Sequence, residues 1–169
     1  MRYREPIILL HKGIIMGIEI ERKFLINKDK LSDLKNGYTI KQGYIQTIDH
    51  TTVRVRIRDK EAFLTIKSKN VGVSRLEFEY PIPLEDADEM LNKLCHTSLI
   101  EKTRYLVKYE GHVWEIDIFK GKNKGLTIAE IELESEDEDF SLPQWVNEEV
   151  TDDVRYFNSN LIESPYTDW

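Results

Sequence analysis

The sequence contains little that would place it among disulfide-rich, zinc-binding or membrane proteins. Its 169 residues include a single cysteine, Cys95, so no disulfide can form within the chain, and a reducing compartment, the cytoplasm, is expected. The four histidines are scattered, and each fits a surface or capping position better than a metal-ligand position. No apolar run approaches the roughly 20 residues that a membrane-spanning helix requires, so no membrane association is expected.

A basic excess is missing as well. The chain has 31 acidic and 24 basic residues, a formal net charge of −7, and no block of like charge. Proteins that bind along a nucleic-acid backbone concentrate a basic excess on one face, so nucleic acid is not an expected partner. Any phosphate that this protein binds must be held by a local cluster of basic side chains.

The chain length suits one compact domain. The first fifteen residues show no clear hydrophobic period and stop just before Met16 and Gly17, which resemble a second chain start. We interpret residues 1–15 as an N-terminal extension, either a start-site tail or an arm that packs on the domain. Residues 16–169 are expected to form the domain itself.

From residue 18 onward, apolar and polar residues alternate with the period of two that is typical of half-buried strands. The pattern predicts eight strands, over residues 18–25, 39–47, 52–58, 62–67, 75–82, 102–109, 112–119 and 126–134. Short connections favour antiparallel pairing of neighbours. Helical spacing is confined to residues 27–35, residues 84–94 and a C-terminal helix starting at Asp152. The expected fold class is therefore α+β, mainly β, with a few flanking helices.

The polar positions of these strands carry mostly full charges. Side chains along a strand point alternately to opposite faces, so Glu19, Glu21 and Lys23 share one face. Charged residues share a face in other strands too: Arg54, Arg56 and Arg58; Arg75, Glu77 and Glu79; Lys102 and Arg104; Glu115 and Asp117; Glu130, Glu132 and Glu134. An open sheet with one solvated face would explain this pattern. If the strands instead close into a barrel, the charges converge on one lumen.

A lumen lined by charges of both signs needs contents that match it, because like charges repel and desolvated charges need partners. Polyphosphate anions match Arg and Lys side chains, while hard divalent cations match carboxylates and bridge to phosphate oxygens. The scarcity of histidine favours Mg²⁺ or Mn²⁺ over zinc.

The order of short motifs along the chain resembles that of the CYTH superfamily, also called triphosphate tunnel metalloenzymes. Glu19, Glu21 and Lys23 match the ExExK motif of its first strand. The other matches follow in order: QGYI (42–45), VRVR (53–56), LTIK (64–67), RLEFEYPI (75–82), EKTRY (101–105), WEIDIF (114–119), GLTIAEIELES (125–135) and EVTDDVRYFN (149–158). ExExK alone is a weak signal, whereas the ordered set is specific.

The resemblance implies an eight-stranded antiparallel closed β-barrel, a triphosphate tunnel, that binds one or two divalent metals and a triphosphate. It implies that the metal ligands are Glu19, Glu21, Glu130 and Glu132. The residues that it implies for phosphate binding are Lys23, Arg54, Arg56, Lys67, Lys102 and Arg104. Lys23, as the contact of the transferred phosphoryl group, and Asp117, as a residue that orients metal-bound water, are the expected catalytic residues.

Members of this superfamily hydrolyse inorganic triphosphate, thiamine triphosphate or RNA 5′-triphosphates, or cyclise ATP, so the fold does not choose the reaction. The short single-domain form, with Pro143 and Trp145 before EVTDD (149–153), most resembles bacterial stand-alone inorganic triphosphatases. We expect metal-dependent hydrolysis of inorganic triphosphate to pyrophosphate and phosphate. The alternatives are a class IV type adenylate cyclase, a thiamine triphosphatase or a non-catalytic triphosphate-binding module. Three or four helices are too few to cover the apolar exterior of eight strands, which leaves room for a dimer contact, so a monomer or a homodimer is expected.

Overall fold

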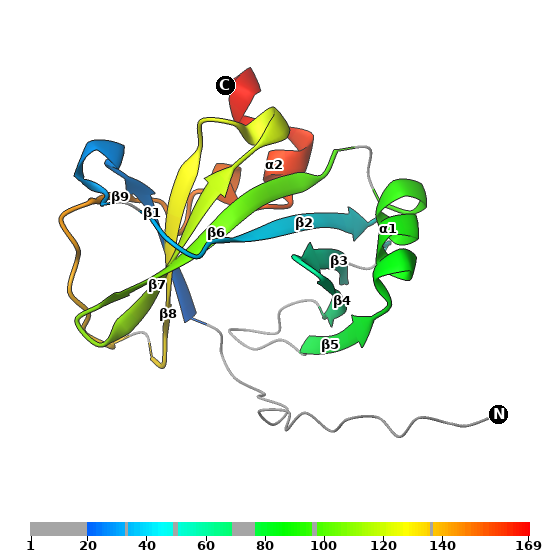
Figure 1. Ribbon diagram of the computed structural model, residues 1–169, viewed down its shortest axis with the longest axis horizontal. Coiled ribbons are helices and arrows are strands. Elements are labelled where there is room, and N and C mark those ends of the chain that lie inside the picture. Colours follow the sequence, from blue (N-terminus) through cyan, green and yellow to red (C-terminus); the bar gives the residue numbers. More distant parts are fainter. Residues whose placement is uncertain (1–19, 33, 49–50, 69–76, 96–97, 136) are drawn as a thin grey trace.

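A nine-stranded antiparallel sheet organises the described part of the chain (Figure 1). The computed structural model describes residues 20–32, 34–48, 51–68, 77–95, 98–135 and 137–169. Its strands are β1 (Ile20–Ile26), β2 (Tyr38–Ile45), β3 (Thr52–Arg58), β4 (Glu61–Lys67), β5 (Glu77–Ile82), β6 (Ile100–Tyr109), β7 (His112–Phe119), β8 (Thr127–Leu133) and β9 (Val146–Glu149). The predicted mainly-β antiparallel fold is confirmed. The predicted boundary between residues 15 and 16 lies outside the described residues and stays a prediction.

The strand order is β5-β4-β3-β2-β6-β7-β8-β1-β9. Pairing of β2 with β6, with Tyr38 opposite Arg104, joins a four-stranded meander to the remaining strands. In Figure 1, β2 and β6 cross the middle of the molecule, with β7, β8 and β1 on the left and β3, β4 and β5 at the lower right. The β2–β6 pairing thus brings the basic strand β3 into the same sheet as the acidic strand β8.

The edges of the sheet differ from the closed barrel that the sequence suggested. Within the described residues, β5 pairs with β4 and β9 pairs with β1, and no ladder of hydrogen bonds joins these two edge strands. β9 was not predicted. It has four residues and is held to the second half of β1 through Phe24 opposite Glu149 and Ile26 opposite Val146.

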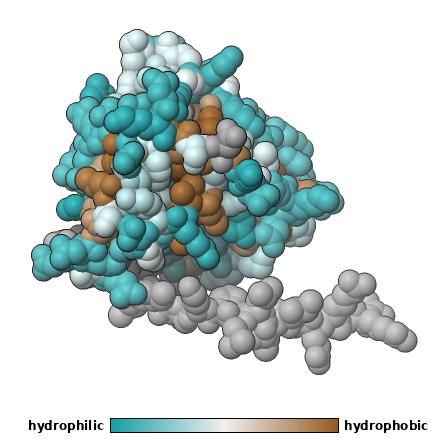
Figure 2. All heavy atoms as spheres, turned by 60° about the vertical axis from the view of Figure 1, so that its left-hand side comes forward, coloured by the Kyte–Doolittle hydropathy of each residue, from teal (hydrophilic) through white to brown (hydrophobic). Residues whose placement is uncertain are grey.

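The apolar residues of β1, β7 and β8 pack on the face opposite to the charges. Phe24, Trp114 and Ile131 are buried there, and Trp145 meets Trp114 edge-on with ring centroids 5.4 Å apart. Leu31 and Leu34, which follow the 3₁₀ turn η1 (Lys28–Lys30), and Phe140, from the segment before β9, cover this layer. Figure 2, which brings the left-hand side of Figure 1 forward, shows apolar residues near the middle of a largely hydrophilic face.

The helices are few and short. α1 (Leu84–Lys93) follows its prediction closely and buries Ala87 and Leu91 against β3 and β4. The 3₁₀ turn η2 (Gly121–Asn123) connects β7 to β8. No helix among the described residues is both long and apolar enough to cross a membrane.

The C-terminal segment does not form the single predicted helix from Asp152. It breaks into η3 (Val154–Tyr156), α2 (Asn160–Glu163) and η4 (Tyr166–Asp168). The Asp153 carboxylate accepts a hydrogen bond from the Arg155 amide and caps η3. Because an N-cap residue is itself non-helical, the helical turn begins after Asp153 and not at Asp152. The break lets Leu161 and Ile162 pack with Phe119 and Ile128 at one end of the charged face.

Candidate active site

Charged side chains from four adjacent strands meet on the face of the sheet opposite to the Trp114 layer. The register places Lys23 of β1 opposite Glu130 of β8, and Glu130 opposite Glu115 of β7. Arg104 of β6 lies opposite Asp117 of β7. Alternation along each strand therefore gathers residues that are far apart in the sequence into one cluster.

The ammonium of Lys23 bridges two carboxylates. Lys23 Nζ donates to Glu130 Oε1 at 2.7 Å and also to Glu21 Oε1. The Lys23 and Glu130 side chains are 12% and 9% exposed, whereas that of Glu21 is 35% exposed. A cation thus already lies between two of the carboxylates that the sequence predicts as metal ligands.

Burial and neighbouring charges set the ionisation of this cluster. Burial, together with the charge of Glu130, raises the pKa of Glu21 to about 7, although Lys23 opposes the rise. Burial opposes ionisation of Glu130, but Lys102, Lys23 and Arg104 hold its pKa below the usual range. For Lys23, the two carboxylates outweigh burial and raise the pKa. Glu130 therefore stays ionised, and Glu21 is the carboxyl group that an added cation would ionise.

A second ion-pair group is almost fully enclosed. Lys102 Nζ donates to Asp117 Oδ2, and both side chains have no exposed surface. Arg104 donates from Nε and Nη2 to the two oxygens of Asp117, at 2.7 and 2.6 Å. It also donates to Glu115 and, at 2.7 Å, to Glu130 Oε2. Burial lowers the pKa of Lys102 despite Asp117, whereas the carboxylates around Arg104 outweigh burial and raise its pKa.

Arg54 on β3 has one N–H group without a hydrogen-bond partner among the described residues. Arg54 Nη2 lies 3.1 Å from Thr65 Oγ1 and 3.3 Å from Glu79 Oε2. Its buried Nε has no hydrogen-bond partner among the described residues. A buried guanidinium N–H group without a hydrogen-bond acceptor destabilises the folded protein, and a bound ligand that accepts from it would remove this cost. On the neighbouring strand β4, Lys67 Nζ pairs with Glu77 Oε2 at 2.8 Å.

Arg56 carries a charge that its hydrogen bonds do not neutralise. Its Nε donates to the neutral amide oxygen of Gln42 at 2.8 Å. Burial, with repulsion from Arg54 and Arg104, lowers the pKa of Arg56 to about 10. Three guanidinium groups therefore act on one buried region, which suits a multiply charged anion.

Two uncharged residues belong to this site and were not predicted. Gln42 lies opposite Arg56 and Tyr44 opposite Arg54 in the β2–β3 ladder. Burial raises the pKa of Tyr44, and the charges of Arg54 and Glu130 both act on its hydroxyl group. Tyr44 is therefore within electrostatic reach of both the basic and the acidic residues of the site. The QGYI motif (42–45) contains both residues, but its uncharged side chains carry no signal for phosphate or metal binding by themselves.

The structure describes three of the four predicted metal ligands, Glu21, Glu130 and Glu132. Glu19 lies outside the described residues, and Glu132, opposite Glu21 in the β1–β8 ladder, is exposed. Within the described residues, no three potential ligand side chains gather closely enough to hold a metal. Glu21 and Glu130 nevertheless share one cation, the Lys23 ammonium. Their oxygen donors fit a hard divalent ion in the same position.

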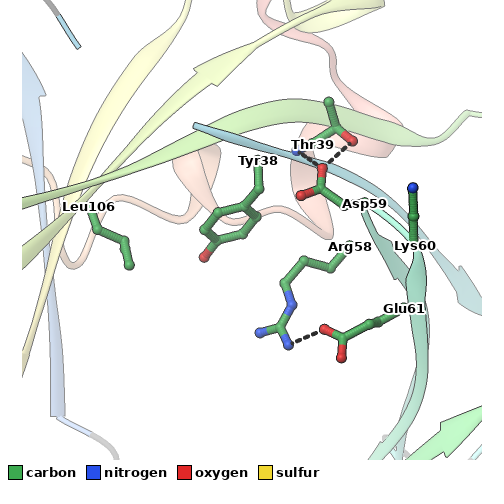
Figure 3. A pocket seen from close by; sticks show the side chains of 7 residues that line it. All are labelled: Tyr38, Thr39, Arg58, Asp59, Lys60, Glu61 and Leu106. Atoms are coloured by element: carbon green, nitrogen blue, oxygen red, sulfur yellow. Dashed lines mark hydrogen bonds and ion pairs between the residues drawn. The ribbon is translucent and has the colours of Figure 1, made fainter. Parts of the chain in front are cut away.

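A pocket of about 760 Å³ lies beside the start of β2 and the turn between β3 and β4 (Figure 3). Its lining consists of Tyr38, Thr39, Arg58, Asp59, Lys60, Glu61 and Leu106. Burial raises the pKa of Tyr38, while Arg104 opposes the rise, so this ring lies within electrostatic reach of the enclosed cluster. Arg58, which lines the pocket, shares one face of β3 with Arg54 and Arg56, so the pocket adjoins the basic part of the site.

Comparison with known proteins agrees with this arrangement. Residues 17–166 match the family model described as CYTH domain. An "Inorganic triphosphatase" of Acetivibrio thermocellus is 48% identical over 151 residues, which are 89% of this chain and 97% of that protein. One from Nitrosomonas europaea is 40% identical over 147 residues, or 85% and 95% of the two chains. The crystal structure of an inorganic triphosphatase superposes with a TM-score of 0.66 at 37% identity, covering 86% of this chain and 95% of the other.

Proposed function

Because this chain belongs to the CYTH domain family, we propose that it hydrolyses inorganic triphosphate to pyrophosphate and orthophosphate with the help of a divalent metal. The main support for inorganic triphosphate as the substrate is the relative of 48% identity, which is named an inorganic triphosphatase and is matched over 97% of its length. The buried guanidinium groups beside carboxylates of β1 and β8 support the same chemistry. The partner is thus a small triphosphate. A cytoplasmic location, a monomer or homodimer, and the absence of nucleic-acid and membrane partners stay predictions.

We propose that Arg54, Arg56 and Lys67 bind the phosphate chain. The unpartnered Nε of Arg54 and the repelled, buried charge of Arg56 both gain from an anion. Charge-assisted hydrogen bonds to phosphate oxygens satisfy the donor and neutralise the mutual repulsion. Arginine also presents two parallel N–H groups that match two phosphate oxygens.

We propose that Glu21 and Glu130 hold the metal, with Glu19 and Glu132 as further ligands. All four contribute oxygen donors, which favours Mg²⁺ or Mn²⁺. When bound, the metal supplies Lewis-acid polarisation of phosphate oxygens and a water of lowered pKa. The Lys23 ammonium would donate to the oxygens of the transferred phosphoryl group. The arginines stabilise the charge that develops there.

Asp117, Lys102 and Arg104 hold one another in the structure. The predicted role of Asp117, orienting a water, and the predicted phosphate contacts of Lys102 and Arg104 would require these groups to separate. We propose that this separation accompanies substrate binding, so that Lys102 and Arg104 contact phosphate oxygens and Asp117 orients the attacking water. Arg104, with its side chain 10% exposed, is the member of the group that faces Glu130.

A phosphate-release assay tests the proposed function. The purified chain is given inorganic triphosphate, ATP or thiamine triphosphate, each with Mg²⁺ or Mn²⁺ and each with excess chelator. We expect the fastest release from inorganic triphosphate, one phosphate per pyrophosphate, and none with chelator. Cyclic AMP as the main product, faster thiamine triphosphate hydrolysis, or triphosphate binding without release would each contradict the proposal.

The matched control for this assay is Lys93→Met. Lys93 is 68% exposed and pairs with Glu89 on the surface of α1, outside the charged cluster of the sheet. This variant should release phosphate at the parent rate, whereas Lys23→Met should not. Equal rates for both variants would remove Lys23 from the catalytic residues.

A further inference from the structure

We infer that Thr65 is a positioning residue for Arg54. Its hydroxyl group, backed by the Glu79 carboxylate, anchors one end of the guanidinium and leaves the other end open to a phosphate group. The inference rests on the proposed function, in which Arg54 binds the phosphate chain. It gives a role to an uncharged residue of β4, the strand that also carries Lys67.

The three residues form a row across strands β3, β4 and β5. Arg54 lies directly opposite Thr65 in the β3–β4 ladder, and Thr65 lies directly opposite Glu79 in the β4–β5 ladder. Residues that are directly opposite each other in an antiparallel ladder have their Cβ atoms about 4.5–5.5 Å apart on the same face. The short threonine side chain is therefore flanked by the two charged side chains, and strand pairing sets its distance to both.

Thr65 connects its two neighbours through one oxygen atom. Thr65 Oγ1 donates to Glu79 Oε2 at 2.8 Å and accepts from Arg54 Nη2 at 3.1 Å. A hydroxyl group has a single hydrogen and a guanidinium has no acceptor, so both bonds can form together only in this direction. The carboxylate thus orients the hydroxyl group, and the oriented oxygen presents a lone pair to the guanidinium.

Thr65 is the more secure of the two anchors of Arg54. It has no exposed surface, whereas the Glu79 side chain is 44% exposed. The direct contact between Arg54 Nη2 and Glu79 Oε2 is also longer, at 3.3 Å. An ion pair with an exposed carboxylate is weakened by water and salt. The buried hydroxyl group therefore contributes most of the restraint on Arg54.

The anchored guanidinium keeps a donor for the substrate. With Nη2 held by Thr65, the buried Nε of Arg54 still lacks a hydrogen-bond partner among the described residues. A donor that is held in place before binding loses little conformational freedom when an anion arrives. Without the hydroxyl group, Arg54 would gain rotamer freedom and would have to be ordered by the phosphate chain itself. Triphosphate affinity should therefore depend on Thr65 through Arg54.

Triphosphate binding by Thr65→Val tests the inference apart from turnover. Valine has nearly the shape of threonine but no hydroxyl group, and it is favourable in strands. Titration calorimetry with inorganic triphosphate in metal-free buffer should show about tenfold weaker binding to the variant. With saturating Mn²⁺, the same loss should appear as a raised KM for inorganic triphosphate.

Mn²⁺ binding without triphosphate separates positioning from a general loss of structure. Thr65→Val should bind Mn²⁺ with the parent affinity, because the proposed metal ligands are on β1 and β8. A disturbed fold would weaken the binding of both ligands. Parent-like triphosphate affinity and KM, or equal losses for triphosphate and Mn²⁺, would overturn the inference.

A double variant tests whether Thr65 acts through Arg54. If it does, Thr65→Val should cause no further loss of triphosphate affinity in a chain that already carries Arg54→Met. The same tenfold loss in both backgrounds would overturn the positioning role. Thr127→Val is the matched control, because Thr127 Oγ1 is buried on β8 without a hydrogen-bond partner among the described residues. This variant should bind triphosphate like the parent.

A second pair of variants removes any dependence on how well valine is tolerated. Thr65→Ser and Thr65→Ala lose the same methyl group and differ from each other in the hydroxyl group alone. The Thr65→Ser variant should bind triphosphate about tenfold more tightly than Thr65→Ala, and equal affinities would contradict the inference. A parent chain that neither binds nor hydrolyses inorganic triphosphate would overturn the proposed function as well. A parent that binds it, with Thr65→Val binding equally well, overturns the positioning role alone.

Discussion

Lys23 donates to Glu130 Oε1 at 2.7 Å although the two residues are separated by 107 positions in the sequence. The same ammonium binds Glu21, so one side chain satisfies two carboxylates that would otherwise repel each other. In this state the protein provides its own cation. Under the proposed metal ligation by Glu21 and Glu130, a divalent metal would compete with this ammonium for the same oxygens.

Lys23→Met should increase metal affinity while abolishing turnover. The substitution removes the cation that competes for Glu21 and Glu130 but keeps a long side chain in place. We expect tighter Mn²⁺ binding to the triphosphate-free variant, by about tenfold, equivalent to roughly 1.4 kcal/mol. Titration calorimetry without triphosphate measures the affinity. Unchanged or weaker Mn²⁺ binding would show that Lys23 does not compete with the metal.

Glu21→Gln should abolish metal-dependent turnover while the fold survives. The amide has nearly the same size but offers no anionic oxygen to a hard cation. Because Glu130 and burial already disfavour ionisation of Glu21, the metal-free variant should be at least as heat-stable as the parent. Phosphate release at saturating metal and thermal unfolding by circular dichroism check the two parts. Activity at the parent level would exclude Glu21 from the metal site.

Arg56→Met should weaken catalysis and remove an internal repulsion. Loss of a charge-assisted phosphate contact costs roughly 1.5–3 kcal/mol of transition-state stabilisation, or about one to two decades in kcat/KM. Inorganic triphosphate should also protect the variant less against heat than it protects the parent. Steady-state kinetics and thermal shifts measure both effects.

Arg58→Met is the matched control for Arg56. Arg58 is on the same face of β3, but its side chain is 45% exposed and pairs with exposed Glu61. Its loss should change stability by no more than about 0.5 kcal/mol and leave kcat/KM near the parent value. Equal effects of the two substitutions would mean that the basic face of β3 is simply solvated.

Leu161→Ala should destabilise the protein markedly. Leu161 has no exposed surface and packs with Phe119 and Ile128, so its truncation leaves a cavity. Such changes cost about 2–5 kcal/mol. Val154→Ala, in the same segment but 57% exposed, should cost less than about 0.5 kcal/mol. Chemical denaturation of both variants gives the comparison; similar stabilities would mean that the C-terminal segment is not part of the core.

Local patterns in the sequence were enough to predict most strands. The period of two fixed the bounds of β3 and β7, because each strand has one apolar and one charged face and is flanked by a short turn. The same alternation placed Lys23, Arg54, Arg56 and Glu130 on one face. β9 escaped prediction because it is short and lies at the sheet edge, where it is formed by pairing with β1 rather than by its own pattern.

The alternation of residues along each strand predicted which charged side chains share a face of the sheet. Tertiary packing decided what each of them contacts. Lys102 and Arg104 have the same parity on β6, yet Lys102 is enclosed with Asp117 while Arg104 extends to Glu130. The difference arises because their neighbours come from strands β7 and β8 and because Phe119 lies beside Lys102. Tyr44 joins the site for the same reason. Side-chain alternation is a property of one strand's backbone, whereas burial and ion pairing depend on register between strands that are distant in the chain.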